Sequence, residues 1–210
     1  MHLLRLPTYA LSSVGLSLAA AVMIGGTYLA SGYFQRAHGM AAITAGLALV
    51  PMGLSSLLAA LVVPRLAGRL GFARLYLCAA AAQLAGAGIL VISTGNALIA
   101  GVALVIIGAG LPSSFVPLYT IGSSHVRPAE SGVGSGLLNT FNQTGAALGV
   151  AVAGTVAAAA AASSLRAGAT AAQAGTHATS AGFAVLAACA VLALINATVL
   201  IRLTRPVSAP

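Results

Sequence analysis

The most constraining feature of this sequence is the length of its uncharged stretches. Residues 6–35, 37–64, 75–126, 131–165 and 167–201 contain no Arg, Lys, Asp or Glu. The hydrocarbon core of a bilayer is about 30 Å thick, so a spanning helix needs roughly 20 apolar residues. Each stretch is long enough to cross, and the stretches are continuous rather than alternating, which argues against a barrel. The sequence therefore predicts an all-α membrane protein surrounded by the lipid bilayer.

The composition excludes the main alternatives. Only ten of the 210 residues are charged, nine Arg and one Glu. A soluble domain has about a quarter of its residues charged, so a soluble globule would have too little to cover its surface. Disorder is excluded because disordered chains are poor in apolar residues, whereas 60% of this chain is hydrophobic. The net charge of +8 does not indicate nucleic-acid binding, since no basic cluster stands beside a soluble fold.

The charge-free stretches divide into six membrane spans. Residues 75–126 are too long for one helix, and the turn signal Ser93-Thr94-Gly95-Asn96 divides them. We expect Pro51 to break the second span and Pro112 and Pro117 to break the fourth. The chain is then a single six-helix transmembrane bundle, residues 1–210, with spans near 8–34, 41–63, 75–93, 97–119, 133–160 and 179–201.

The arginines predict the orientation of this bundle. An even number of spans places both termini on one side, together with Arg5, Arg65, Arg69, Arg74, Arg127, Arg202 and Arg205. Arg36 and Arg166 are on the other side. Seven against two agrees with the positive-inside rule. We expect a protein integral to the inner (cytoplasmic) cell membrane, with both termini in the cytoplasm.

Two pairs of glycines are spaced for close helix contact. Gly132 and Gly136 are four residues apart, as are Gly145 and Gly149. Such pairs let helix backbones approach in lipid, where no hydrophobic force drives helices together. Either packing within one bundle or dimerisation would use them.

Neutral polar residues form three candidate sets inside the spans. The hypotheses are a polar cavity lining or hydrogen bonding between helices. Helical spacing places the members of two sets on one face each. The sets are Tyr28, Ser31 and Gln35 on the first span, Ser113, Ser114 and Tyr119 on the fourth, and Asn139, Asn142 and Gln143 on the fifth.

Groups for catalysis or metal binding are lacking inside the spans. The only side chains there that titrate are Tyr and Cys, and Cys78 and Cys189 lack metal-ligand spacing. Ser135 between two glycines suggests an intramembrane serine protease, but no His lies within a span to serve as its base. We therefore predict no enzyme, no cofactor and no metal site. The four His and the one Glu are expected in loops or tails: His2, His38, His125, His177 and Glu130.

Several segments together resemble a known family. Residues 33–35 (YFQ) and 45–53 (AGLALVPMG) resemble a stretch of the major facilitator superfamily, and more narrowly of its fourteen-span drug:proton antiporter branch. Residues 131–140 (SGVGSGLLNT) and 143–151 (QTGAALGVA) are similar to two further motifs of that branch. The resemblance covers nearly the whole chain, in the right order.

The resemblance implies that the chain is the C-terminal half of such an exporter. A missing N-terminal half, or a homologous half-bundle, would then be its partner. In this family the first and fourth helices of each half line the central cavity, which implies substrate contact for Tyr28, Ser31, Gln35, Ser113, Ser114 and Tyr119. The segment 65–74, with Arg65, Arg69 and Arg74, resembles the family's loop motif, and Asn139, Asn142, Gln143, Gly145 and Gly149 belong to its fifth-helix motifs.

Two departures from the family pattern argue against a role in proton coupling for the loop motif and for the fifth-helix motif. Gly68 stands at the acidic position of the loop motif, and Asn142 stands where the branch commonly has Arg. The coupling carboxylates are expected mainly in the absent half.

The functional hypothesis is therefore half of a secondary active, proton-coupled exporter. It would move small amphipathic or drug-like compounds by alternating access. The alternatives are a non-transporting truncated fragment or a helix-packing scaffold in the membrane.

Overall fold

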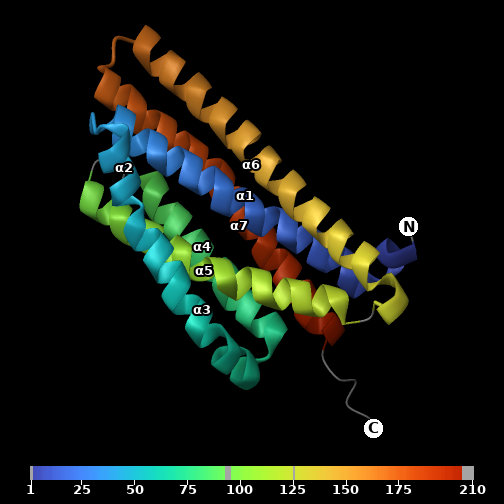
Figure 1. Ribbon diagram of the computed structural model, residues 1–210. Coiled ribbons are helices and arrows are strands. Elements are labelled where there is room, and N and C mark those ends of the chain that lie inside the picture. Colours follow the sequence, from blue (N-terminus) through green and yellow to red (C-terminus); the bar gives the residue numbers. More distant parts are fainter. Residues whose placement is uncertain (1, 93–95, 125, 205–210) are drawn as a thin grey trace.

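The computed structural model describes residues 2–92, 96–124 and 126–204, and within them it is helical (Figure 1). Six helical segments are long and apolar enough to cross a membrane, which confirms the predicted fold class. Short 3-10 helices at His2–Arg5 and Pro128–Glu130 accompany seven α-helices. These are α1 (Pro7–Arg36), α2 (Ala42–Ala48), α3 (Val50–Leu70), α4 (Phe72–Ile92), α5 (Ala97–Ser123), α6 (Ser131–Arg166) and α7 (Ala171–Thr204).

The second crossing is interrupted close to its predicted proline. The helix ends at Ala48 and begins again at Val50, and Pro51 lies in the first turn of α3. Proline is tolerated there because the first backbone N–H groups of a helix have no partner within the helix. The same expectation was wrong for the fourth span. Pro112 and Pro117 lie inside α5, which is continuous, because neighbouring helices hold a proline-containing span together.

The turn between the third and fourth crossings is described only in part. Ser93, Thr94 and Gly95 lie outside the described residues. Asn96 caps α5, where its Oδ1 accepts hydrogen bonds from the backbone N–H groups of Leu98 at 2.9 Å and Ile99 at 3.4 Å. This is a preferred role for Asn, because its side chain replaces a missing helical acceptor.

Helix α1 lies at the centre of the bundle. It packs against α5, α6 and α7, while α4 packs between α5 and α7. The two outer helices are α3, which leans mainly on α5, and α6, which leans on α1 and α7 (Figure 1). In the most apolar part of each crossing, 56% of α1 is buried but only 22% of the α6 segment and 11% of the α2–α3 segment.

Glycines and serines hold the outer helices on the bundle. A Cβ at Gly149 of α6 would lie 2.5 Å from Cα of Ala21 on α1, and Gly145 meets the backbone of Ser17 equally closely. Ser17 donates its hydroxyl to the carbonyl oxygen of Phe141 at 2.8 Å. Ser55 of α3 donates to the carbonyl of Val105 on α5 at 2.9 Å. These small side chains allow the close approach that lipid alone does not enforce.

The basic segment 65–74 is more helical than expected. Its family resemblance suggested a loop, but α3 continues to Leu70 and α4 starts at Phe72. Only Gly71 lies between them. Its φ of +80° suits glycine, and its N–H donates to the carbonyl of Ala67 at 2.9 Å. Arginines indicate where the hydrocarbon core ends. A helix can continue beyond that point into the polar interface until a helix-ending residue such as Gly71.

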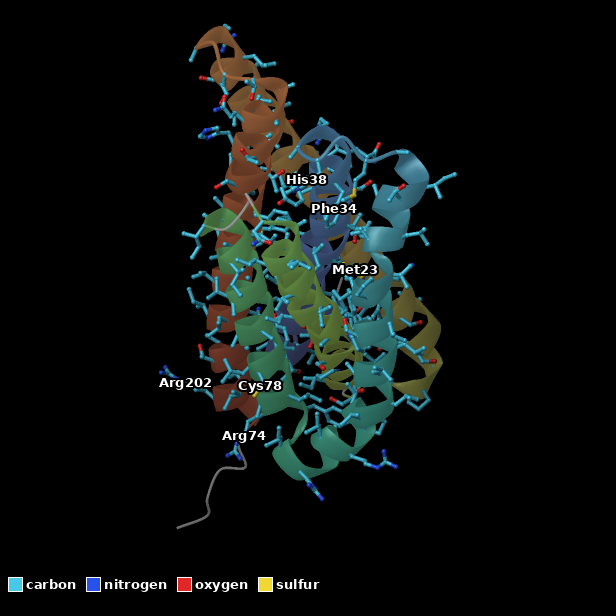
Figure 2. All side chains as sticks on the ribbon, turned by 90° about the vertical axis from the view of Figure 1, so that its left-hand side faces the viewer. Met23, Phe34, His38, Arg74, Cys78 and Arg202 are labelled. Atoms are coloured by element: carbon cyan, nitrogen blue, oxygen red, sulfur yellow. The ribbon has the colours of Figure 1, made fainter. Side chains whose placement is uncertain are left out.

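The ends of the helices agree with the predicted grouping of the arginines. The start of α1 and the end of α7 lie at the same end of the bundle (Figure 1). Arg74 and Arg202 lie at that end, whereas His38 lies at the opposite end (Figure 2). We call these the terminal end and the far end. His125 and Arg205 lie outside the described residues.

Candidate functional site

The three polar residues predicted on the first span lie near the far end of α1. Tyr28 is 48% exposed, and Ser31 and Gln35 follow it toward the end of the helix. The amide Nε2 of Gln35 donates to Oγ of Ser31 at 2.9 Å. This bond uses one donor and leaves the amide oxygen of Gln35 and the hydroxyl of Tyr28 available to a ligand.

Tyr28 also borders a groove between α1, α6 and α7. The tyrosine ring stands against Gly154 of α6, where an added Cβ would lie 3.2 Å from its Cε1. The groove has a volume of about 350 Å³, and alanines of α6 form most of its wall. Arg36 lines it from the last turn of α1. The groove is therefore mainly apolar, with one hydroxyl and one guanidinium on the α1 side.

The two serine hydroxyls of the α5 set donate hydrogen bonds to backbone carbonyls of α5 itself. Ser114 is fully buried and donates its hydroxyl to the carbonyl of Gly110 at 3.0 Å. Ser113 is half-buried and donates to the carbonyl of Ala109 at 3.2 Å. Tyr119 is half-buried near the terminal end of α5. Hydroxyls that already bond to a helix carbonyl have less left to offer a ligand.

The α1 set and the α5 set lie at different heights in the bundle. Leu118 of α5 meets Gly15 of α1, which makes the two helices antiparallel neighbours with Ser114 close to the level of residue 19. Tyr28 is nine residues further along α1, about 14 Å at 1.5 Å per residue. The two predicted sets therefore lie at different levels of the bundle and do not form a single cluster.

The amides of α6 form a polar face that the bundle leaves uncovered. Asn139 and Gln143 are exposed, and Asn142 is half-buried. The nearby Gly145 and Gly149 pack against α1, as described above, which favours packing within one bundle for that glycine pair. Gly132 and Gly136 instead meet open space. Ser135 donates its hydroxyl to the carbonyl of Gly132 at 3.1 Å, one turn back on its own helix.

The arginines of the loop motif surround the α3–α4 turn. Arg65 and Arg69 lie in the last turns of α3, and Arg74 lies in the first turn of α4. All three are exposed, and Gly68 between them faces open space. The segment is a cationic surface at the terminal end of the bundle.

Three of the residues expected in loops or tails have defined positions in the structure. His38 follows the end of α1 and is exposed, with its ring edge-on to that of Tyr33, centroids 4.8 Å apart. His177 lies in α7 and not in a loop, because that helix begins at Ala171. Glu130 closes the short 3-10 helix before α6.

A buried polar group on α4 and α7 was missed from the sequence. Tyr76, Gln83 and Asn196 are almost fully buried, and each has a side-chain oxygen or nitrogen without a hydrogen-bond partner among the described residues. The hydroxyl of Tyr76 and Oδ1 of Asn196 lie 3.1 and 3.0 Å from the position that a Cβ would take on Gly15. Gln83 and Asn196 were visible as isolated amides in apolar stretches, but they lack the helical spacing that drew attention to the other sets.

Comparison with known proteins identifies the family to which this chain belongs. Residues 2–150 match the Major Facilitator Superfamily. The chain is 32% identical over 128 residues to the protein named Drug efflux pump JefA of Mycobacterium tuberculosis, in strain CDC 1551 / Oshkosh and in strain ATCC 25618 / H37Rv. The aligned part is 60% of this chain and 25% of each relative, so the chain corresponds to about a quarter of the length of the curated proteins it matches. With this match over most of its length and six helices suited to a membrane, the chain belongs to the major facilitator superfamily, a family of transporters rather than of enzymes.

Proposed function

We propose that this chain is the C-terminal half of a secondary active exporter. Its partner is a second six-helix bundle, and together the two halves move small amphipathic or drug-like compounds outward by alternating access. The energy comes from a proton gradient. The name of the M. tuberculosis relatives, a drug efflux pump, supports export as the direction of transport.

The observation that carries this proposal is the uncovered amide face of α6. Gly149 meets Ala21, which stands at the middle of α1, so Gly149 marks the middle of the membrane. Gln143 is six residues away, about 9 Å along the helix. Half of the hydrocarbon core measures about 15 Å, so the exposed Gln143 amide lies inside it. A polar side chain at that depth is expected to face a cavity or another helix, since facing lipid would leave its hydrogen bonds unmade.

The pattern of burial supports a second bundle. The outer helix α6 carries the amide face, and α3, on the other flank, has the least buried crossing. Between them, α1 contributes the exposed Tyr28 and the half-buried Ser31. A second bundle placed against these helices would enclose the polar residues in a space between the halves. Inverted or parallel repeats of this kind place transporter sites near the membrane midplane.

Proton coupling is assigned to the absent half. A carrier driven by protons needs a group that takes up a proton on one side and releases it on the other. In this chain the spans carry no Asp, Glu or His apart from His177, which lies in the second turn of α7 near the far end and is exposed. The carboxylates for coupling are therefore expected on the partner bundle.

The test begins with the size of the native product. An antibody against residues 202–210 is applied to membranes of the source cells, and the species it captures is reconstituted into proteoliposomes. A band more than twice the 20.4 kDa of this chain, with dye export driven by an imposed pH gradient, is the expected result. Replacing Gln143 by Leu in that species should slow export. Replacing Val133, an exposed apolar residue in the first turn of the same helix, by Leu should not.

The alternatives give different results. A 20.4 kDa band with no flux, alone or with any bundle captured alongside it, would contradict the proposal and favour a truncated fragment. Specific cross-linking to another protein without flux would favour a helix-packing scaffold.

A further inference from the structure

A second groove lies at the terminal end of the bundle, beside the α3–α4 turn. It has a volume of about 300 Å³ and is lined by the end of α3, the start of α4, and the ends of α5 and α7. Its walls are mainly apolar, with Leu70, Phe72, Ile121 and Ile201 among them. Among the described residues of the lining, Arg74 is the charged one.

Two arginines from different helices lie at this end of the bundle. Arg74 lies in the first turn of α4 and Arg202 in the last turn of α7, and these helices pack against each other in opposite directions. Both side chains project outward at the same end of the bundle (Figure 2). Arg202 follows Ile201 and lies two residues before Thr204, and both of those residues line the groove. Arg74 is therefore an exposed guanidinium in the wall of an apolar groove, and Arg202, which does not line the groove, is exposed at the same end of the bundle (Figure 2).

The chain has almost nothing of its own to neutralise these cations. Its single acidic side chain is Glu130, which closes the 3-10 helix that precedes α6. The groove is formed by α3, α4, α5 and α7, and not by that segment. A guanidinium presents five N–H donors in a planar fork that matches a phosphate group. An external anion would satisfy those donors, since no Asp or Glu stands among the described residues that line the groove.

We propose that this groove binds one anionic phospholipid of the adjoining leaflet. The phosphate of its headgroup lies on Arg74, with Arg202 beside it, and the first part of an acyl chain lies along Phe72 and Ile201. Basic pockets between transmembrane helices at the cytoplasmic face bind such headgroups. The apolar wall distinguishes this occupant from a soluble phosphate ion, which would gain nothing from Phe72 or Ile201. The proposal concerns a site separate from the amide face and does not depend on transport.

The test measures which lipid the full chain retains. The protein is placed in nanodiscs of phosphatidylcholine containing a minor share of phosphatidylglycerol, and retained lipids are counted by native mass spectrometry. We expect preferential retention of one phosphatidylglycerol. Arg74→Gln should lower that retention about tenfold, as the loss of a charge-assisted hydrogen bond implies. Arg74→Lys should keep part of it, because the charge remains while the planar fork is lost.

Arg65→Gln is the matched control. Arg65 is exposed at the same end and carries the same charge, but it does not line the groove. Its retention of phosphatidylglycerol should stay within about twofold of the unchanged protein, since only a surface charge is removed. Ala73→Leu provides a second variant, because Ala73 lines the groove. The larger side chain should fill the groove and lower the retention of phosphatidylglycerol, although every arginine is still present.

Three results would overturn the proposal. Equal losses in Arg74→Gln and Arg65→Gln would mean that diffuse charge attracts the lipid. Equal retention of phosphatidylcholine would mean that the headgroup charge is not recognised. Displacement of the lipid by inorganic phosphate would mean that the site takes the anion alone. Size-exclusion profiles of all variants show whether each remains folded.

Discussion

Replacing Gly149 by Ala is expected to loosen the contact between α1 and α6. The added Cβ would lie 2.5 Å from Cα of Ala21, 2.6 Å from its carbonyl oxygen and 2.8 Å from its Cβ. Favourable contacts between carbon atoms begin at about 3.5 Å, so the two helices must separate by roughly 1 Å. Two of the three atoms belong to the backbone of Ala21, so a change of rotamer cannot relieve the clash.

The magnitude follows from two opposing effects. Overpacking of a well-packed contact costs about 1–3 kcal/mol. Exchange of Gly for Ala within a helix contributes up to about 1 kcal/mol in the opposite direction. Gly136 provides the matched control, because it lies on the same helix and a Cβ there meets nothing within 4 Å. The Gly149→Ala variant should therefore be less stable than Gly136→Ala by about 1–3 kcal/mol, since the helix effect is shared.

The free energies of unfolding can be measured by reversible denaturation in lipid bicelles. Equal stability of the two alanine variants would refute the packing role of Gly149. A loss at Gly136 that depends on protein concentration would instead reveal dimerisation through the exposed glycine pair, the second use of glycine spacing that the sequence left open.

Three further predictions can be tested on the same protein. Tyr9→Phe should lower the free energy of unfolding by about 1 kcal/mol, because the Tyr9 hydroxyl donates to the carbonyl of Gly134 at 2.6 Å. Tyr76→Phe should change it by less than about 0.5 kcal/mol, because the buried Tyr76 hydroxyl has no hydrogen-bond partner among the described residues. A larger loss for Tyr76→Phe than for Tyr9→Phe would contradict this account. In a chain without native cysteines, a cysteine at Ala167 should react with an impermeant thiol reagent added outside cells and one at Ala129 should not, and labelling of both or of the second alone would refute the predicted orientation. Proteoliposomes containing only this polypeptide should show no proton-driven export, because the spans lack a coupling carboxylate, and robust export would refute that claim.

The polar residues show where prediction from the sequence was incomplete. Helical spacing grouped the side chains of α1 and of α6, since residues three, four and seven apart share a face. It did not show that Ser114 is buried and bonded to its own helix, while Tyr28 is about half exposed. That difference depends on which neighbouring helix covers each face, and no local pattern records it.

Several missed features have the same origin. The buried amide of Gln83 is packed against Gly110 of α5, and Asn196 donates to the carbonyl of Leu11 on α1 at 3.2 Å. Each contact joins residues far apart in the sequence. The groove beside Arg74 likewise combines the ends of four crossings, so none of its walls could be assigned from one segment.

The sequence by itself determined the number of crossings and the two groups of arginines. The physical reason is local: the bilayer sets a minimum apolar length for each crossing, and charges must lie outside the hydrocarbon core. Only the tertiary structure decided which glycines pack, how high each polar residue lies relative to the next helix, and which arginines border a groove. Those properties depend on the lateral order and vertical register of the helices, which are set by contacts such as Gly149 with Ala21 between residues more than a hundred positions apart.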